Sequence, residues 1–206
     1  MTPAKAITLG VAAALAALAG LVVAQLMLTP KDIEIASGTL LKQPRAIEAF
    51  QLSDTAGAPF DNARLQGHWS LVFAGFTYCP DVCPSTLAML KGLKGKLDAA
   101  QTPLQVVFVS VDPQRDTPDK LDRYVHYFSP EFVGITGSEA ELEKLARSMS
   151  LVFAKVPGST PDSYTMDHSA ALVLINPQAQ VAGYFLPPHH VDALSADLQR
   201  VIRGQR

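Results

Sequence analysis

The chain has 206 residues and a formal net charge of −2; 48% of its residues are apolar, 17% are charged and only two are cysteines. An ordinary apolar fraction and a small net charge exclude a disordered chain and a strongly basic nucleic-acid-binding protein. Two cysteines also exclude a disulfide-dense scaffold and a zinc site made of cysteine alone, which needs four thiolates.

Residues 6–28 form an apolar run without a charged side chain. A helix of this length crosses the hydrocarbon core of a bilayer, so we expect residues 1–30 to be an N-terminal membrane anchor. Lys5 precedes the run, and Lys31, Asp32 and Glu34 follow it. The positive-inside rule then places the N-terminus in the cytoplasm and the rest of the chain on the other side of the membrane.

A cleaved signal peptide is the alternative interpretation of this segment. Val22, Val23 and Ala24 offer a small residue at a plausible cleavage position, although the apolar run is longer than the usual h-region of about 7–15 residues. Because an Arg- and Ser-rich transit sequence is absent, we expect a single-pass protein of a bacterial inner membrane, with its soluble domain in the periplasm.

Residues 31–46 mix Gly, Pro, Thr and Lys without an apolar period and predict a tether, followed by a domain over residues 47–206. Residues 31–206 carry 16 basic and 19 acidic side chains, a net charge of −3, so nucleic acid is not an expected partner. The domain opens with a predicted β-hairpin over residues 49–60, whose turn is Asp54-Thr55-Ala56-Gly57.

Two buried strands then alternate with two helices. Residues 70–78 and 105–111 are nearly continuous apolar runs, typical of strands buried on both faces of a parallel sheet. Leucine spacing predicts a helix over residues 84–99, and Asp116-Thr117-Pro118 predicts the start of another that continues to about Phe128. Because helical crossovers join parallel neighbours, we expect the two strands to belong to one parallel sheet.

The next segment predicts an inserted helix and loop. Ser138 and Glu141 form a capping-box pattern for a helix that ends near Met149. Residues 151–156 predict a strand, and residues 157–165 predict a polar, turn-rich loop of the kind that carries function.

The chain closes with a predicted hairpin and helix. Five residues separate the apolar runs 170–175 and 181–185, so these strands are expected to be antiparallel, and an amphipathic helix follows over residues 191–202. This order of elements predicts an α/β, thioredoxin-like fold with an N-terminal hairpin and an inserted helix and loop, behind a single transmembrane helix.

Cys79 and Cys83 lie where the first buried strand passes into the first helix, in the sequence Cys-Pro-Asp-Val-Cys-Pro. Residues four apart in a helix are about 6 Å apart at Cα, a separation that allows a disulfide and also lets both sulfurs bind one ion. The positive end of the helix dipole favours thiolate over thiol. Redox and metal chemistry are therefore alternatives at this site, beside an inert disulfide, which would stabilise little by closing so small a loop.

His168 precedes the strand that begins at Ala170. In a thioredoxin-like sheet this strand neighbours the one that leads to Cys79, so we expect His168 to approach the cysteines and complete a three-ligand set. Met166 is a soft donor two residues away, for which a space-filling role is the simpler interpretation. Ordinary polar roles are expected for the remaining histidines, which are His68, His126, His189 and His190.

Three motifs together resemble the Sco/SenC family: Phe76–Pro84 (FTYCPDVCP), Val111–Pro118 (VDPQRDTP) and Asp167-His168-Ser169. The resemblance covers about residues 47–203. It implies a membrane-tethered, thioredoxin-like protein that binds copper, as Cu(I) or Cu(II), through Cys79, Cys83 and His168.

By this resemblance the function is that of a copper metallochaperone for the dinuclear copper centre of cytochrome c oxidase. The implied partners are the oxidase copper-binding subunit and other copper chaperones or thiol reductases. An enzymatic alternative is a thiol-disulfide oxidoreductase that uses Cys79 and Cys83 to reduce the oxidase cysteines. A thiol peroxidase ranks last, because Phe76 and Pro80 stand three residues before the two cysteines, where such an enzyme has Thr.

Overall fold

The computed structural model describes residues 15–21, 24, 33–160 and 163–204, and the chain divides into two units, residues 1–33 and 34–206. In the first unit, residues 15–21 and 24 are helical and exposed. Within the described ranges, no helix has the length and apolar character needed to cross a membrane. The predicted anchor over residues 1–30 falls mostly outside these ranges and stays a prediction.

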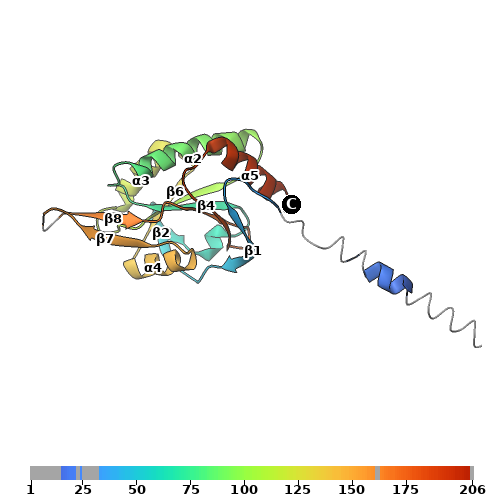
Figure 1. The fold of residues 1–206 in the computed structure, drawn as a ribbon. Coiled ribbons are helices and arrows are strands. Elements are labelled where there is room, and N and C mark those ends of the chain that lie inside the picture. The colour runs from blue at the N-terminus through green and yellow to red at the C-terminus, as the bar shows by residue number, and fades with distance from the viewer. Residues whose placement is uncertain (1–14, 22–23, 25–32, 161–162, 205–206) are drawn as a thin grey trace, which may run out of the picture. The chain divides into compact units, whose positions relative to one another are not determined.

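The second unit is built on a mixed sheet with the strand order β1-β10-β9-β4-β5-β6-β2-β3 (Figure 1). Its strands are β1 (Thr39–Ala46), β2 (Leu52–Asp54), β3 (Pro59–Phe60), β4 (Ser70–Gly75), β5 (Gln105–Ser110), β6 (Val133–Thr136), β9 (Leu172–Ile175) and β10 (Gln180–Phe185). A separate antiparallel ribbon is formed by β7 (Phe153–Pro157) and β8 (Tyr164–His168). The helices are η1 (Asn62–Leu65), α2 (Val82–Ala99), α3 (Pro118–Phe128), α4 (Glu139–Ser148) and α5 (Val191–Gly204).

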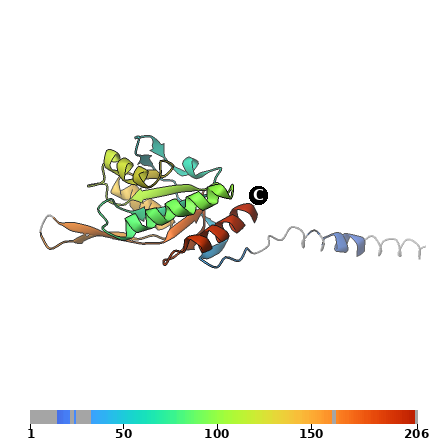
Figure 2. The ribbon, with the colours of Figure 1, turned by 90° about the horizontal axis from the view of Figure 1, so that it is seen from above.

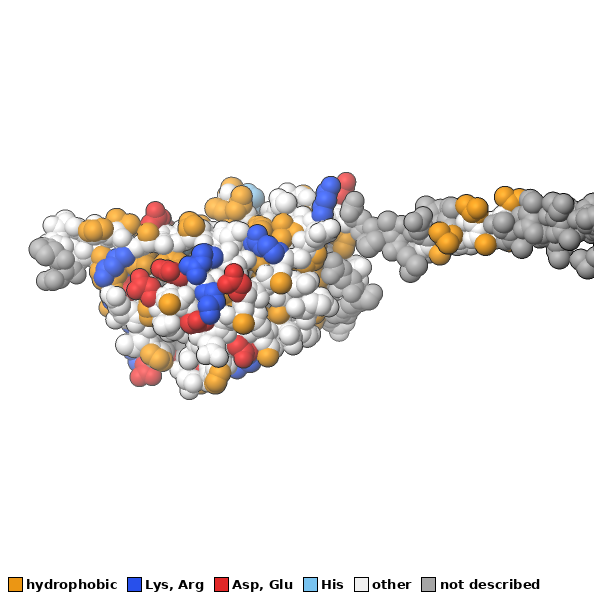
Figure 3. All heavy atoms as spheres, turned by 90° about the horizontal axis from the view of Figure 1, so that it is seen from below, with side chains coloured by type: hydrophobic (Ala, Val, Ile, Leu, Met, Phe, Trp, Pro, Cys, Tyr) orange, Lys and Arg blue, Asp and Glu red, His pale blue; other side chains and the backbone are white. Residues whose placement is uncertain are grey.

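The sheet is covered on both faces. Helices α2 and α5 pack side by side above it, while α4 lies on the opposite side (Figures 1 and 2). Successive side chains of β4 point to opposite faces of the sheet. Val72 and Ala74, which share one face, pack in the same core cluster as Leu142 and Leu145 of α4. On the face shown in Figure 3, acidic and basic side chains are interspersed among hydrophobic ones, and neither sign dominates.

The predicted chain order is confirmed at the centre of the sheet. Strands β4, β5 and β6 are parallel neighbours joined through α2 and α3, whereas β9 and β10 form the expected antiparallel hairpin. The N-terminal hairpin is present as β2 and β3. Ser138 caps α4 by accepting a hydrogen bond from the Glu141 amide, as its motif predicts, but the Glu141 carboxylate accepts from the Gln51 amide instead of closing the box.

Residues 39–46, which the sequence assigns to the tether 31–46, instead form edge strand β1 and pair antiparallel with β10. Most side chains of β1 are exposed, so its sequence shows no alternation of apolar and polar residues. Arg45 fixes the strand by donating hydrogen bonds to the Ser148 carbonyl and to the hydroxyls of Ser150 and Tyr184. The compact unit therefore begins before the predicted boundary at residue 47.

The polar excursion over residues 157–165 also differs from a simple loop. Its last two residues, Tyr164 and Thr165, belong to β8, which pairs with β7 from Phe153↔His168 to Pro157↔Tyr164. Main-chain hydrogen bonds of the ribbon thus extend from the loop to His168.

We expect Gly183→Ala to lower the free energy of unfolding by about 1–3 kcal/mol, the usual cost of overpacking. A Cβ atom at Gly183 would lie 2.6 Å from the Thr39 carbonyl oxygen, so β1 would have to shift. Chemical denaturation measures the change. The matched control is Gly92→Ala in α2, where the new methyl meets no atom within 4 Å and helix propensity favours alanine. Equal changes in the free energy of unfolding of the two variants would contradict the position of β1 in the sheet.

Candidate metal centre

The two cysteines lie at different depths in the turn between β4 and α2. Helix α2 begins at Val82, between the two prolines, and Asp81 gives it no side-chain cap. The Cys79 sulfur instead caps the start of the helix, because it accepts a hydrogen bond from the Cys83 amide at 3.4 Å. Cys79 is half-buried, Cys83 is fully buried and neither is in a disulfide. Cys79, in the loop, is therefore the more accessible of the two cysteines.

Cys83 sits against the end of β4 at a position that only glycine allows. A Cβ atom at Gly75 would lie 2.7 Å from the Cys83 sulfur and 2.8 Å from the Phe108 ring. Burial in this close packing raises the pKa of the Cys83 thiol. The expectation of thiolate stabilisation by the helix end is therefore wrong for Cys83, where desolvation outweighs the dipole. A cation that binds here has to displace a proton.

His168 reaches the cysteines because the strand that follows it, β9, pairs antiparallel with β4, with Phe73 opposite Leu172. Its Nε2 atom lies 3.4 Å from the Cys83 sulfur. The Nδ1 atom lies 3.2 Å from the Ser169 carbonyl oxygen and so carries the proton, which leaves the Nε2 lone pair toward the sulfur. The rings of Phe73 and Phe76 pack edge-on against the imidazole and restrict its orientation.

The three predicted side chains thus meet at one point. The Cys79 and Cys83 sulfurs and one His168 nitrogen all lie within 4.8 Å of one another. At a metal–sulfur distance of about 2.3 Å, two sulfur ligands of one ion lie at most about 4.6 Å apart, so small side-chain movements bring all three atoms onto one ion. Among the described residues, no other group of His, Cys, Asp or Glu side chains has this arrangement.

Three of the four remaining histidines make other side-chain contacts. His68 bonds the Gln105 side chain, His126 lies 3.1 Å from Asp122, and His189 lies near the Ala170 carbonyl. Met166 is partly buried and packs against the hydrophobic core, in agreement with a space-filling role.

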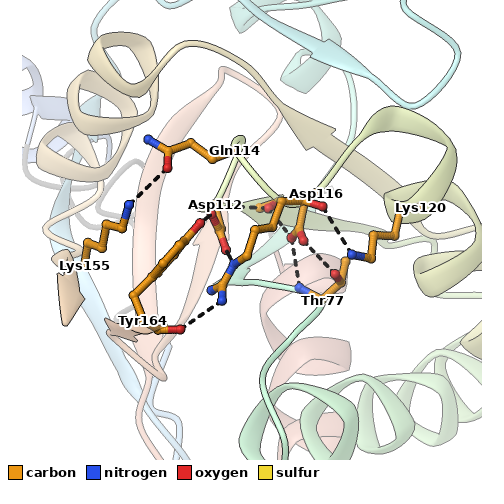
Figure 4. Close-up of polar contacts among 9 residues, drawn as sticks. Thr77, Asp112, Gln114, Asp116, Lys120, Lys155 and Tyr164 are labelled. Carbon is orange, nitrogen blue, oxygen red and sulfur yellow. Dashed lines mark hydrogen bonds and ion pairs between the residues drawn. The ribbon is translucent and has the colours of Figure 1, made fainter. Parts of the chain in front are cut away.

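A buried carboxylate fixes the start of the cysteine loop. Asp116 accepts hydrogen bonds from the Thr77 amide at 2.8 Å, the Thr77 hydroxyl at 2.6 Å and the Ser110 hydroxyl at 2.6 Å (Figure 4). Asp116 does not cap α3, since Thr117 occupies the N-cap of that helix. Asp116 instead ties the loop two residues before Cys79 to the end of β5.

Arg115 connects the β7–β8 ribbon, which carries His168, to the loop that follows β5. Its Nε atom donates to the buried Asp112 carboxylate at 2.5 Å, and its guanidinium also donates to the Tyr164 carbonyl at 2.9 Å. The Tyr164 hydroxyl in turn donates to Asp112 at 2.8 Å (Figure 4). Burial and this hydrogen bond raise the pKa of Tyr164 to about 12, so the hydroxyl keeps its proton.

Cation–π contacts extend this connection into a ladder of five side chains. The Arg115 guanidinium lies 3.6 Å from the Tyr164 ring centre and 4.8 Å from that of Tyr78. Lys120 covers Tyr78 at 3.6 Å, and Lys155 covers Tyr164 at 3.8 Å. Tyr78 is the residue before Cys79, so the ladder links the cysteine loop to the β7–β8 ribbon. Arg115 and Tyr78 stand in two of the motifs quoted above, but their contact with each other and with Tyr164 could not be predicted, because no spacing rule brings these segments together.

We expect Arg115→Met to lower the free energy of unfolding by about 3 kcal/mol, because it leaves the Asp112 carboxylate buried without its partner. Amide hydrogen exchange of residues 164–168 should rise as well. The matched control is Arg64→Met: Arg64 also stacks on an aromatic ring, Phe60, but its own side chain is exposed, and its ion pair with Asp54, at 3.5 Å, should contribute less than about 1 kcal/mol. Unchanged exchange in Arg115→Met would show that the ladder does not hold the ribbon.

The chain matches known proteins over most of its length. The sequence profile of the SCO1/SenC family matches residues 39–203. A protein of Stutzerimonas stutzeri described as copper-binding is 36% identical over 176 residues, which cover 84% of this chain and 85% of that protein.

Solved structures agree. Copper-bound ScoI of Arabidopsis thaliana is 30% identical, with a TM-score of 0.70 over 82% of this chain and 99% of that one. BsSco, described as a member of the Sco family of cytochrome c oxidase assembly proteins with a disulfide switch, shares the fold at 23% identity, with a TM-score of 0.62 over 79% and 97% of the two chains. The chain, with a mixed α/β fold that matches these structures, belongs to the SCO1/SenC family.

Proposed function

We propose that this chain binds one copper ion through Cys79, Cys83 and His168 and delivers it to the dinuclear copper centre of cytochrome c oxidase during assembly. The observation that carries the proposal is the convergence of the three donors, with His168 Nε2 at 3.4 Å from the Cys83 sulfur. Copper-bound and copper-binding relatives support the choice of ion, and BsSco supports the link to oxidase assembly.

The donor set itself favours copper. Two thiolates and one imidazole are soft to intermediate ligands, which suit Cu(I) in a three-coordinate site. Structural zinc sites take four protein ligands, and the group here has three. Cu(II) would need a further donor, which water or a partner's side chain can supply at the half-buried side of the site.

The unequal exposure of the ligands suits delivery rather than permanent storage. Cys83 is buried and anchored in the first turn of α2, whereas Cys79 lies in the preceding loop and is half-exposed. An incoming thiolate can therefore approach the ion from the side of Cys79 and replace the protein's ligands one at a time. Copper is in this sense the cargo of the protein.

The site of delivery is also part of the proposal. Residues 6–28 carry no charged side chain and would anchor the chain in a bacterial inner membrane, with residues 34–206 in the periplasm. The oxidase copper-binding subunit would then be reached on that side of the membrane.

A second candidate function is thiol-disulfide exchange with the oxidase cysteines. Two free thiols whose sulfurs lie within 4.8 Å favour it, because they can close a disulfide. In that reaction Cys79 and Cys83 lose two electrons and two protons as their disulfide forms, and the partner's disulfide becomes two thiols. Metal binding and this disulfide exclude each other.

Titration of the reduced full-length chain with Cu(I) should give one bound equivalent. We expect His168→Ala to weaken binding at least tenfold, about 1.4 kcal/mol, and Cys79→Ser or Cys83→Ser to abolish tight binding. The matched control is His126→Ala on α3, whose ring contacts Asp122 and should leave the affinity unchanged. Competition with a Cu(I) chelator measures the affinities, and wild-type affinity in His168→Ala would contradict the ligand set.

The same variants separate the two functions. A delivery protein should lose copper transfer to the oxidase copper domain in His168→Ala, while its thiols still reduce a disulfide. Rapid reduction of that domain by the copper-free chain, without detectable copper transfer from the loaded chain, would favour the oxidoreductase.

A further inference from the structure

A hollow of about 460 Å³ opens beside the cysteine loop, between the start of α2 and helix α3. Thr77 and Pro84 line one side of it, and these two residues bracket the segment that contains Cys79 and Cys83. A molecule bound in the hollow would therefore lie next to the loop from which copper leaves. The rest of the lining comes from α3.

The wall of the hollow is aromatic and remains partly uncovered. Phe128 packs edge-on against Tyr124 and Tyr127, at ring-centre distances of 5.6 and 5.2 Å. Tyr127 is 80% exposed, an unusual state for an aromatic residue with this much contact area. Aromatic residues with one open face are typical of protein interfaces.

The polar side chains of the lining offer hydrogen-bond donors and positive charge. Lys120 and Arg123 are its charged residues, and no carboxylate contributes to it. Arg123 is exposed and forms no ion pair with any of the residues that the structure describes. The complementary occupant carries negative charge.

We propose that this hollow is where the copper acceptor docks, through an acidic segment of the acceptor that carries an apolar side chain. The apolar side chain packs on Tyr127 and Phe128, and a carboxylate pairs with Arg123. The inference rests on the proposed copper delivery, because it places the acceptor beside Cys79.

The test measures binding of the copper-loaded full-length chain to the copper-free, soluble dinuclear-copper domain of the oxidase subunit, at 20 and 200 mM salt. Arg123→Glu should weaken binding at least tenfold and reduce its salt dependence, and Tyr127→Ala should weaken it at least fivefold. The matched control is Arg147→Glu on α4, which makes the same charge change at an exposed arginine on the opposite face and should stay within twofold of wild type. Equal losses in the two Arg→Glu variants, or none in Arg123→Glu, would overturn the proposal.

Copper titration of every variant keeps this inference separate from the proposed function. Arg123 and Tyr127 are not ligands, so their variants should bind one Cu(I) with wild-type affinity. If the wild-type chain binds copper but not the oxidase domain, the docking site is refuted and copper binding stands. If the chain docks through the hollow without binding copper, the delivery function is refuted instead.

Discussion

The antiparallel pairing of β9 with β4 is the constraint on which the candidate metal centre depends. Strand β4 leads into the loop that carries Cys79, and β9 begins four residues after His168. Because the two strands run side by side in opposite directions, the end of one lies beside the start of the other. Residues 85 positions apart in the chain are thereby brought to a separation of 3.4 Å between Cys83 Sγ and His168 Nε2. Both strands are buried on both faces of the sheet, so a slip of one residue would exchange the side chains that pack in the two core layers and disrupt the packing of both.

Around this pairing, two buried carboxylates, Asp112 and Asp116, anchor the segments that carry the ligands. Asp116 anchors the cysteine loop to β5, and Asp112, with Arg115, anchors the ribbon that ends at His168. Both carboxylates come from the loop that follows β5, at the edge where an α/β sheet presents its sites. Rigid support on one side and a half-exposed Cys79 on the other would combine a defined coordination geometry with a route for ligand exchange.

The residues that could be predicted from the sequence are those with a local signal. Continuous apolar runs predicted β4 and β5, and leucine spacing predicted α2. The Cys-x-x-x-Cys spacing predicted that two sulfur donors lie close together. His168 could be placed only through the expected topology. Strand β1 escaped prediction because its side chains face solvent, so no alternation marks it. The raised pKa of the Cys83 thiol and the contacts of Tyr78 and Tyr164 with Arg115 also could not be foreseen, because both arise from tertiary packing between distant segments.

X-ray absorption at the copper edge can show whether Cys79, Cys83 and His168 act together on one copper ion. For the Cu(I)-loaded chain, we expect two sulfur scatterers at about 2.3 Å and one imidazole nitrogen at about 2.0 Å. In His168→Ala the outer-shell scattering of the imidazole ring should disappear while both sulfurs remain. A wild-type spectrum with sulfur ligands alone, or with a single sulfur, would contradict the account.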